Sequence, residues 1–349
     1  GNLSFYQNIL GLRLVKQTVN FDDPHTYHLY YGDDQGSPGT IITFFPWENL
    51  APGTIGTGMV SAIAFAIPRD STDFWSHRIT AAGTAIQTGE RFGEPVIQFT
   101  DPCGLPIELI GIANPPSTGQ RHQGPIPGNQ AILGVHSATA TLKSFDDIHT
   151  LLADVMGMEL HRQEDNRYRF RMANHESPGH YYDVVVDADA PVGTSGGGTV
   201  HHIAFRTESD RSQALWQSHL RQKGVSVTSV RDRNYFRSIY FKSPGGVLFE
   251  IATDPPGFTV DEPGPSLGTS LKLPAQYEAI RADIEKRLPP LHSAPLPHVY
   301  KEAPELLDDG RTIVPLHGTG GSEHDLVRFA QDTASASAIL SPRGQVLEN

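Results

Sequence analysis

Hydrophobic and polar positions repeat in one order along this chain. Residues 200–205 alternate and predict a strand, and residues 211–223 predict a helix that ends at Gly224, a typical residue after a helix. Three strand-like runs follow, and the last two flank a tight turn within residues 238–251. The predicted module is therefore a strand, a helix and three strands.

A second copy of the module lies earlier in the chain. Its opening strand, its helix and its final hairpin are expected at residues 60–65, 71–82 and 96–109, with Gly83 closing the helix. The turn at residues 101–104 aligns with the turn at residues 243–246. This alignment places Glu108 on Glu250.

Two further copies complete the pattern. The third begins with a strand at residues 133–139 and a helix at 145–156 that Gly157 closes, and its later strands are expected near residues 158–162, 168–172 and 181–186. The first begins in a helix at residues 3–10 that Gly11 closes, and its strands are expected at residues 12–19, 26–31 and 40–45. Because its opening strand is absent, we expect the chain to be a fragment of a longer protein.

Four modules of this kind resemble the vicinal-oxygen-chelate superfamily, which includes glyoxalase I, bleomycin-resistance proteins and extradiol dioxygenases. The resemblance covers about residues 1–254 and implies an α+β fold in which βαβββ modules pair into two curled-sheet barrels. The expected boundaries are modules one and two in 1–111, a linker in 112–130, modules three and four in 131–254, and a tail helix with a Pro-rich linker in 255–304.

Residues 305–349 carry a different pattern. A strand that runs into His317-Gly-Thr-Gly-Gly resembles the oxyanion loop of α/β-hydrolases of the carboxylesterase and thioesterase kind. The resemblance implies the incomplete start of a hydrolase domain. No Gly-x-Ser-x-Gly follows, so this piece has no recognisable nucleophile. A flexible tail with a chance cluster of glycines is the alternative.

Composition narrows the classes of partner. The net charge is −12 and no basic stripe is present, which argues against nucleic acid and anionic membrane surfaces. No apolar run reaches the length of a membrane span. The single cysteine, Cys103, excludes an intrachain disulfide and fits a reducing compartment, so we expect a cytoplasmic protein. The sequence does not decide whether the protein forms a homo-oligomer.

Candidate metal ligands lie in the fourth module. His202 is on its first strand and Glu250 on its last, and these strands lie side by side in a curled module. Two histidines and one carboxylate on one face of the metal are typical of non-haem Fe(II) oxygenases, which keep positions open for substrate and O₂. The alternative is a structural histidine beside a glutamate that merely ends a strand.

The second module is an internal control for these ligands. It has Ser61-Ala62 where the fourth module has His201-His202, although it keeps a glutamate at the place of Glu250. The fold of the module therefore does not require histidine at this place. We interpret the presence of His201 and His202 in the fourth module as a sign of metal binding.

Further residues enter through a closer resemblance. The run from Tyr240 to Glu250 is similar to the signature of extradiol dioxygenases, and residues 232–240, 249–254, 12–24, 27–32 and 44–47 resemble hydroquinone-type ring-cleaving dioxygenases. This resemblance implies that Arg233 and Tyr240 line the substrate pocket and that His201 lies beside the metal ligands. A tyrosine there can hold and protonate an oxygen, and an arginine can stabilise negative charge. The alternatives are a cross-strand aromatic and a solvated charge.

The third metal ligand has two candidates. The resemblance implies a histidine on the absent opening strand of module one, because modules one and four share the metal barrel in the hydroquinone-type family. His136, at the place in module three that matches His202, is the rival, since catechol-type relatives pair modules three and four. We favour the absent strand. We therefore expect module one to pack against module four, and module two against module three.

The expected function is an Fe(II)-dependent dioxygenase that cleaves hydroquinone- or catechol-type rings with O₂. Two other classes stay open. One is a glyoxalase-like isomerase or lyase that uses Zn²⁺ or Ni²⁺, and the other is a metal-free module that binds aromatic molecules. Metal analysis combined with O₂ uptake separates the three.

Overall fold

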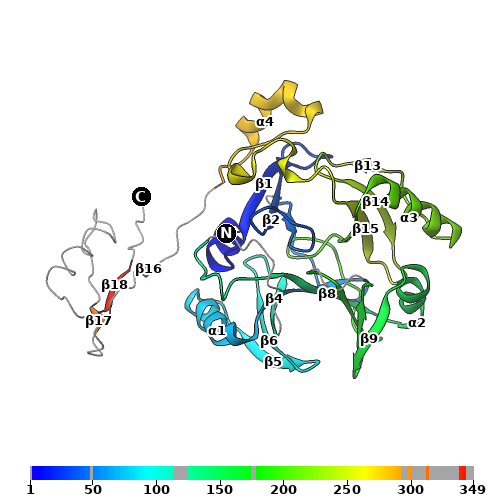
Figure 1. Cartoon of the computed structure of the whole chain (residues 1–349), viewed down its shortest axis with the longest axis horizontal. Coiled ribbons are helices and arrows are strands. Elements are labelled where there is room, and N and C mark those ends of the chain that lie inside the picture. The colour runs from blue at the N-terminus through cyan, green and yellow to red at the C-terminus, as the bar shows by residue number, and fades with distance from the viewer. Residues whose placement is uncertain are drawn as a thin grey trace. The chain divides into compact units, whose positions relative to one another are not determined.

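Modules two and three share one eight-stranded sheet in the computed structural model, which describes residues 2–47, 50–113, 124–173 and 178–291 and three short strands beyond them (Figure 1). Their opening strands, β4 (Met59–Pro68) and β8 (Gly134–Leu142), pair antiparallel at its centre. Each also pairs in parallel with the last strand of its own module, β7 (Pro106–Ile112) or β11 (Tyr181–Val186). The outer strands are β5 (Gln87–Arg91), β6 (Glu94–Thr100), β9 (Glu159–Glu164) and β10 (Arg167–Arg171). The predicted pairing of modules two and three is confirmed.

Modules one and four form two separate sheets. The first has the order β1-β2-β3 and the second the order β12-β15-β14-β13. Their strands are β1 (Arg13–Val19), β2 (Tyr27–Gly32), β3 (Ile42–Phe44), β12 (Ile203–Thr207), β13 (Arg231–Asp232), β14 (Arg237–Lys242) and β15 (Leu248–Thr253). The ring of Tyr30 meets that of Tyr235 edge to face, with centroids 6.2 Å apart. The predicted contact between modules one and four is confirmed.

The two sheets end at β3 and β12, and each of these strands pairs on one side only among the described residues. In module two the corresponding place is held by β4, which pairs on both sides. No strand of the described part of the chain holds that place between β3 and β12. The expected absence of an opening strand in module one thus corresponds to an open position between two strand edges.

The four module helices end as predicted at glycines with a positive φ, +71° at Gly11, +80° at Gly83, +70° at Gly157 and +80° at Gly224. The helices are η1 (Ser4–Ile9), α1 (Thr72–Ala81), α2 (Asp146–His149) continued by η3 (Thr150–Val155), and α3 (Asp210–Gln222). Unlike the prediction, η1 and η3 are π-helical. Each buries two adjacent side chains, Phe5 and Tyr6 in η1 and Leu151 and Leu152 in η3.

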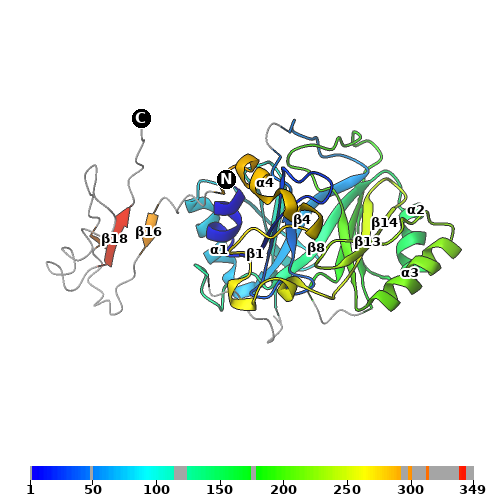
Figure 2. The same cartoon turned by 90° about the horizontal axis from the view of Figure 1, so that it is seen from above.

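The helices also join the two barrels. Those of modules one and two lie side by side, and so do those of modules three and four (Figure 2). Nε of Arg78 in α1 donates to the carbonyl oxygen of Ile9 at 2.8 Å, and Nε2 of His219 in α3 lies 2.9 Å from the carbonyl oxygen of Val155. No helix among the described residues is long and apolar enough to cross a membrane.

The segment after β15 returns across module one. The ammonium of Lys16 is fully buried and lies 2.6 Å from Asp261 and 2.5 Å from Glu262. Gln17 bridges to Leu271, so the segment adds one isolated pairing to β1. Its helical turns are η4 (Phe258–Val260), η5 (Gly264–Ser266), η6 (Ala275–Ile280) and α4 (Arg281–Arg287). The segment therefore straps module four to module one.

Gly268→Ala is expected to loosen this strap. Gly268 has a φ of +74°, and a Cβ there would lie 1.8 Å from the backbone oxygen of Leu14. Because both groups are backbone, neither can move cheaply, and we expect a loss of about 3 kcal/mol in the free energy of unfolding. Gly264→Ala is the matched control, since no atom lies within 4 Å of its Cβ. Denaturant unfolding measures both; equal stabilities would contradict the strap.

Residues 293–349 form a second compact unit. The structure describes three short strands in it, β16 (His298–Tyr300), β17 (Thr312–Ile313) and β18 (Ala338–Pro342). β17 lies within the strand predicted before His317, and it pairs in parallel with β18. The expected oxyanion loop at His317 lies outside the described residues, as do residues 114–123 of the expected linker. The start of a hydrolase domain therefore stays a prediction.

Candidate metal centre and substrate pocket

The two predicted metal ligands lie in contact. Nε2 of His202 is 2.7 Å from Oε2 of Glu250. The contact follows from the parallel pairing of β12 with β15, in which Ala204 lies opposite Glu250, and from the two-residue period that puts His202 on the face of Ala204. Two atoms bound to one metal ion at about 2.0–2.2 Å lie roughly 3 Å apart. The predicted approach of these side chains is confirmed.

The strand that carries His202 is shorter than predicted. β12 begins at Ile203 rather than at residue 200. A strand needs a neighbour to pair with, and among the described residues β12 pairs with β15 alone. His201 and His202 therefore lie just before the ladder, at the open position between β3 and β12.

Three donors surround the carboxylate of Glu250, which is 2% exposed. Burial raises its pKa, but hydrogen bonds from His202, Ser238 and Tyr240 outweigh burial and hold the pKa below its ordinary value. The hydroxyl of Tyr240 donates to Oε1 at 3.0 Å, and the Ser238 hydroxyl donates to the same oxygen. The carboxylate is therefore ionised and can bind a cation. The sequence analysis did not predict Ser238 as part of the site. Its position two residues before Tyr240 on β14 puts it on the same face of the strand and could have indicated it.

His201 lies beside His202, as the resemblance implied. Their Nδ1 atoms are 2.9 Å apart. Burial, followed by the nearby His202, lowers the pKa of His201 and favours its neutral form. A metal-binding histidine commonly uses its second ring nitrogen in such a hydrogen bond, which fixes the orientation of the ring. The contact leaves Nε2 of His202 directed at Glu250.

Arg233 and Tyr240 extend this cluster. Nε of Arg233 donates to the Tyr240 hydroxyl at 3.4 Å, and the guanidinium lies over the ring of Phe21 at 5.4 Å. Burial, and then the charge of Glu250, raise the pKa of Tyr240 to about 12. The phenol therefore keeps its proton at neutral pH. It can donate that proton towards an oxygen in front of Glu250.

A cavity of about 1090 Å³ opens in front of the cluster. His201, His202, Arg233, Tyr240 and Glu250 line it together with aromatic side chains of module one. A phenol-sized molecule needs less room than this, and part of the cavity borders the open position beside β12. Apolar walls with a few polar groups at one end are typical of sites for small aromatic molecules.

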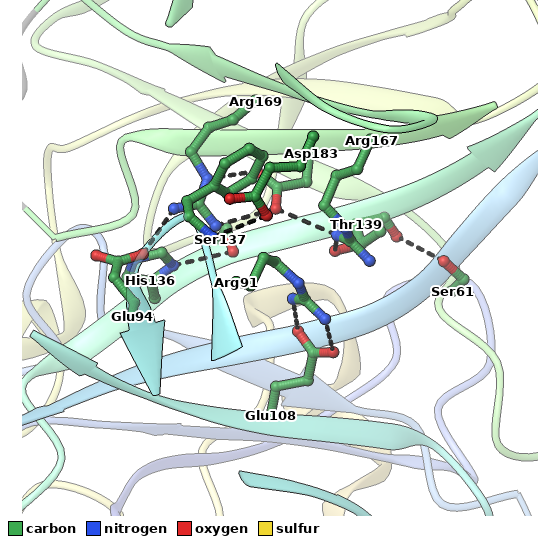
Figure 3. Close-up of polar contacts among 12 residues, drawn as sticks. Ser61, Arg91, Glu94, Glu108, His136, Ser137, Thr139, Arg167, Arg169 and Asp183 are labelled. Carbon is green, nitrogen blue, oxygen red and sulfur yellow. Dashed lines mark hydrogen bonds and ion pairs between the residues drawn. The ribbon is translucent and has the colours of Figure 1, made fainter. Parts of the chain in front are cut away.

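The matching place in the other barrel holds no metal pair. Ala64 and Gln98 lie opposite Glu108 in the ladder, as Ala204 and Tyr240 lie opposite Glu250. The guanidinium of Arg91 instead donates to both oxygens of Glu108, at 2.5 and 2.8 Å (Figure 3). Here a protein cation neutralises the carboxylate.

His136 belongs to this second barrel as well. Its Nδ1 lies 3.0 Å from the Ser137 hydroxyl and its Nε2 lies 3.6 Å from Glu94 (Figure 3). The residue is on β8, and it does not line the cavity that contains His202. The structure therefore does not bring His136 to the candidate ligands. Among the described residues no group of three or more His, Cys, Asp or Glu side chains could hold a metal ion.

Known proteins share this arrangement of modules. The profile of the Glyoxalase/Bleomycin resistance protein/Dioxygenase superfamily matches residues 1–109 and 135–251. The protein named ring-cleaving dioxygenase MhqO of Bacillus subtilis (strain 168) is 44% identical over 295 residues, which cover 83% of this chain and 91% of that protein. The chain belongs to the ring-cleaving dioxygenases of this superfamily.

Three further comparisons concern a curated relative and two solved structures. The chlorohydroquinone/hydroquinone 1,2-dioxygenase of Sphingobium indicum is 33% identical over 293 residues, which cover 81% of this chain and 90% of that protein. The crystal structure of a dioxygenase from Bacillus subtilis has a TM-score of 0.80 at 43% identity and covers 84% of this chain and 93% of its own. Glyoxalase I from Zea mays, with a TM-score of 0.55 at 15% identity, shares the fold alone. The predicted α+β fold of this superfamily is confirmed.

Proposed function

We propose that the protein is an Fe(II)-dependent dioxygenase that cleaves hydroquinone- or catechol-type rings with O₂, with hydroquinone as the favoured class. The contact between His202 and Glu250, at the end of an aromatic cavity, carries the proposal. The relative named as a chlorohydroquinone/hydroquinone 1,2-dioxygenase supports the substrate class.

The ligands would be Nε2 of His202 and the carboxylate of Glu250. Their chemistry fits Fe(II), because an imidazole and an ionised carboxylate are two of the three ligands in a facial triad. We propose that the third ligand comes from a strand that precedes η1 and fills the open position between β3 and β12. When bound, Fe(II) supplies the Lewis-acid and redox chemistry that ring cleavage by O₂ needs.

The remaining polar residues would act on the substrate itself. The guanidinium of Arg233 can stabilise negative charge that develops on a phenolic oxygen. The Tyr240 hydroxyl lies between Arg233 and Glu250, and it can hold that oxygen and return a proton to it. His201 would keep the ring of His202 in its binding orientation.

Anaerobic loading of the full-length protein with Fe(II), followed by O₂ uptake, tests the proposal. Hydroquinone and catechol are compared side by side; we expect O₂ uptake with hydroquinone, and none when Zn²⁺ or Ni²⁺ replaces iron. Isomerase activity with Zn²⁺ or Ni²⁺ but no O₂ uptake would favour a glyoxalase-like enzyme. Binding of aromatic molecules that a chelator leaves unchanged, again without O₂ uptake, would favour a metal-free module.

A further inference from the structure

A second histidine, which the proposed chemistry does not use, lines the same cavity. His28 is on β2 in module one, and it is 9% exposed. Side chains alternate along this strand, so Leu29 and Tyr31 join the main core, while His28 and Tyr30 face the opposite side. On that side the ring of Tyr30 meets the aromatic residues of module four and the strap. His28 thereby lies in the wall of the cavity that also contains His202 and Glu250.

The ring of His28 is fixed on two sides. It stacks on Phe45, with centroids 4.1 Å apart, and Phe45 stacks in turn on Trp47 at 5.1 Å. The hydroxyl of Tyr30 lies 2.9 Å from Nδ1. A buried phenol donates its proton where it can, which makes Nδ1 the acceptor. Burial, together with nearby His202 and Arg233, holds the pKa of His28 well below its ordinary value. The ring is then neutral and carries its proton on Nε2.

That Nε2 has no hydrogen-bond partner among the described residues, although it is buried. Buried polar atoms of side chains are paired in the large majority of cases, and each exception needs an explanation. Since His28 lines the cavity, an oxygen of a bound molecule can supply the missing partner. Nε2 of His28 is therefore a polar group in the cavity wall that can bind a ligand oxygen. It lies far along the chain from the candidate metal ligands and in a different sheet.

We propose that Nε2 of His28 binds the second oxygen of the substrate, the one that does not go to the metal, so that the site selects 1,4-diols. This inference rests on the proposed function. The candidate metal ligands lie at β12 and β15 and His28 lies on β2, so the two polar groups reach the same cavity from different sheets. A ring with oxygens at opposite ends presents one to each. A 1,2-diol carries both oxygens on one side and leaves Nε2 unpaired.

Equilibrium binding separates this role from catalysis. Hydroquinone and 4-methylphenol differ only where a methyl group replaces the second hydroxyl. Their dissociation constants are measured anaerobically by calorimetry with the Fe(II)-loaded full-length protein and with His28→Phe. We expect the unmodified protein to prefer hydroquinone about tenfold, and the variant to bind both molecules with equal strength, because the buried hydroxyl has lost its partner.

Two further variants support the test. His28→Gln retains a hydrogen-bond donor, so we expect part of the preference for hydroquinone over 4-methylphenol to remain. This variant replaces His28→Phe if the Phe variant does not fold. Tyr30→Phe removes the group that fixes the tautomer, and we expect an intermediate preference with an unchanged constant for 4-methylphenol.

The outcomes distinguish this inference from the proposed function. A preference for hydroquinone that persists in His28→Phe overturns the role of His28. This result is expected if the proposed strand beside β12, and not the substrate, supplies the hydrogen-bond partner of Nε2. Equal binding of both molecules by the unmodified protein also overturns the role of His28. In either case O₂ uptake with hydroquinone leaves the proposed function standing. Failure to bind either molecule, without O₂ uptake, overturns both.

Discussion

Glu250→Gln is expected to abolish iron binding while the fold survives. The amide has nearly the same shape, and the hydroxyls of Ser238 and Tyr240 can still donate to its oxygen. It lacks the negative charge that attracts Fe(II). Loss of an outer hydrogen-bond partner alone costs about 10–100-fold in metal affinity, so we expect a larger loss here. Anaerobic Fe(II) titration measures it, and O₂ uptake should fall with iron occupancy.

Glu108→Gln is the matched control, since this residue holds the same place in module two. Iron affinity should stay unchanged. The free energy of unfolding should fall instead, by about 3–5 kcal/mol, because the guanidinium of Arg91, which is 11% exposed, loses its counter-charge. Equal losses of iron affinity in both variants would show that the metal is not confined to module four.

Tyr240→Phe is expected to slow turnover by about 10²–10⁴-fold, the usual contribution of a group that transfers a proton in the rate-limiting step. The change removes one hydroxyl and keeps the ring, so barrel packing should persist. Iron occupancy at saturation should not change, because Tyr240 is not a proposed ligand. O₂ uptake at full iron loading is the measurement.

A second tyrosine provides the control for that variant. Tyr168 is in module three, where its ring stacks on Phe145 at 4.0 Å. Tyr168→Phe removes the same hydroxyl far from the candidate ligands in sequence and should leave the rate unchanged. Near-normal turnover in Tyr240→Phe would remove Tyr240 from the mechanism and leave His202 and Glu250 to be judged separately.

Local signals in the sequence were enough to predict the modules and their register. The turns at residues 101–104 and 243–246 aligned Glu108 with Glu250, and the ladders give the two glutamates matching neighbours. Turn residues, helix-closing glycines and strand alternation act over a few residues. Each copy of the module could therefore be read independently and compared with the others.

Pairs of distant residues could not be predicted in this way. Lys16 finds its two carboxylates about 245 positions later in the chain, and no periodic pattern announces that contact. The contact between Arg91 and Glu108 could not be predicted either, because in the sequence Arg91 is one of several polar residues on an exposed strand. His28 lies within residues 27–32, whose only signal in the sequence is their resemblance to hydroquinone-type dioxygenases. Its Nε2 can be recognised as unpaired among the described residues only in the folded structure, where His28 lines the cavity.

The guanidinium bound to Glu108 makes the two barrels differ in how far their buried carboxylates depend on a metal ion. Arg91 is a cation that the chain carries with it, so the barrel of modules two and three needs nothing from outside to balance its carboxylate. Glu250 has no arginine in that position, and in the proposed enzyme its balance depends on the free concentration of iron. A ligand that binds only the folded state adds stability as its concentration rises. Scarcity of iron would thus lower the stability that the barrel of modules one and four contributes, while the Arg91–Glu108 pair in the other barrel would keep its charge balance.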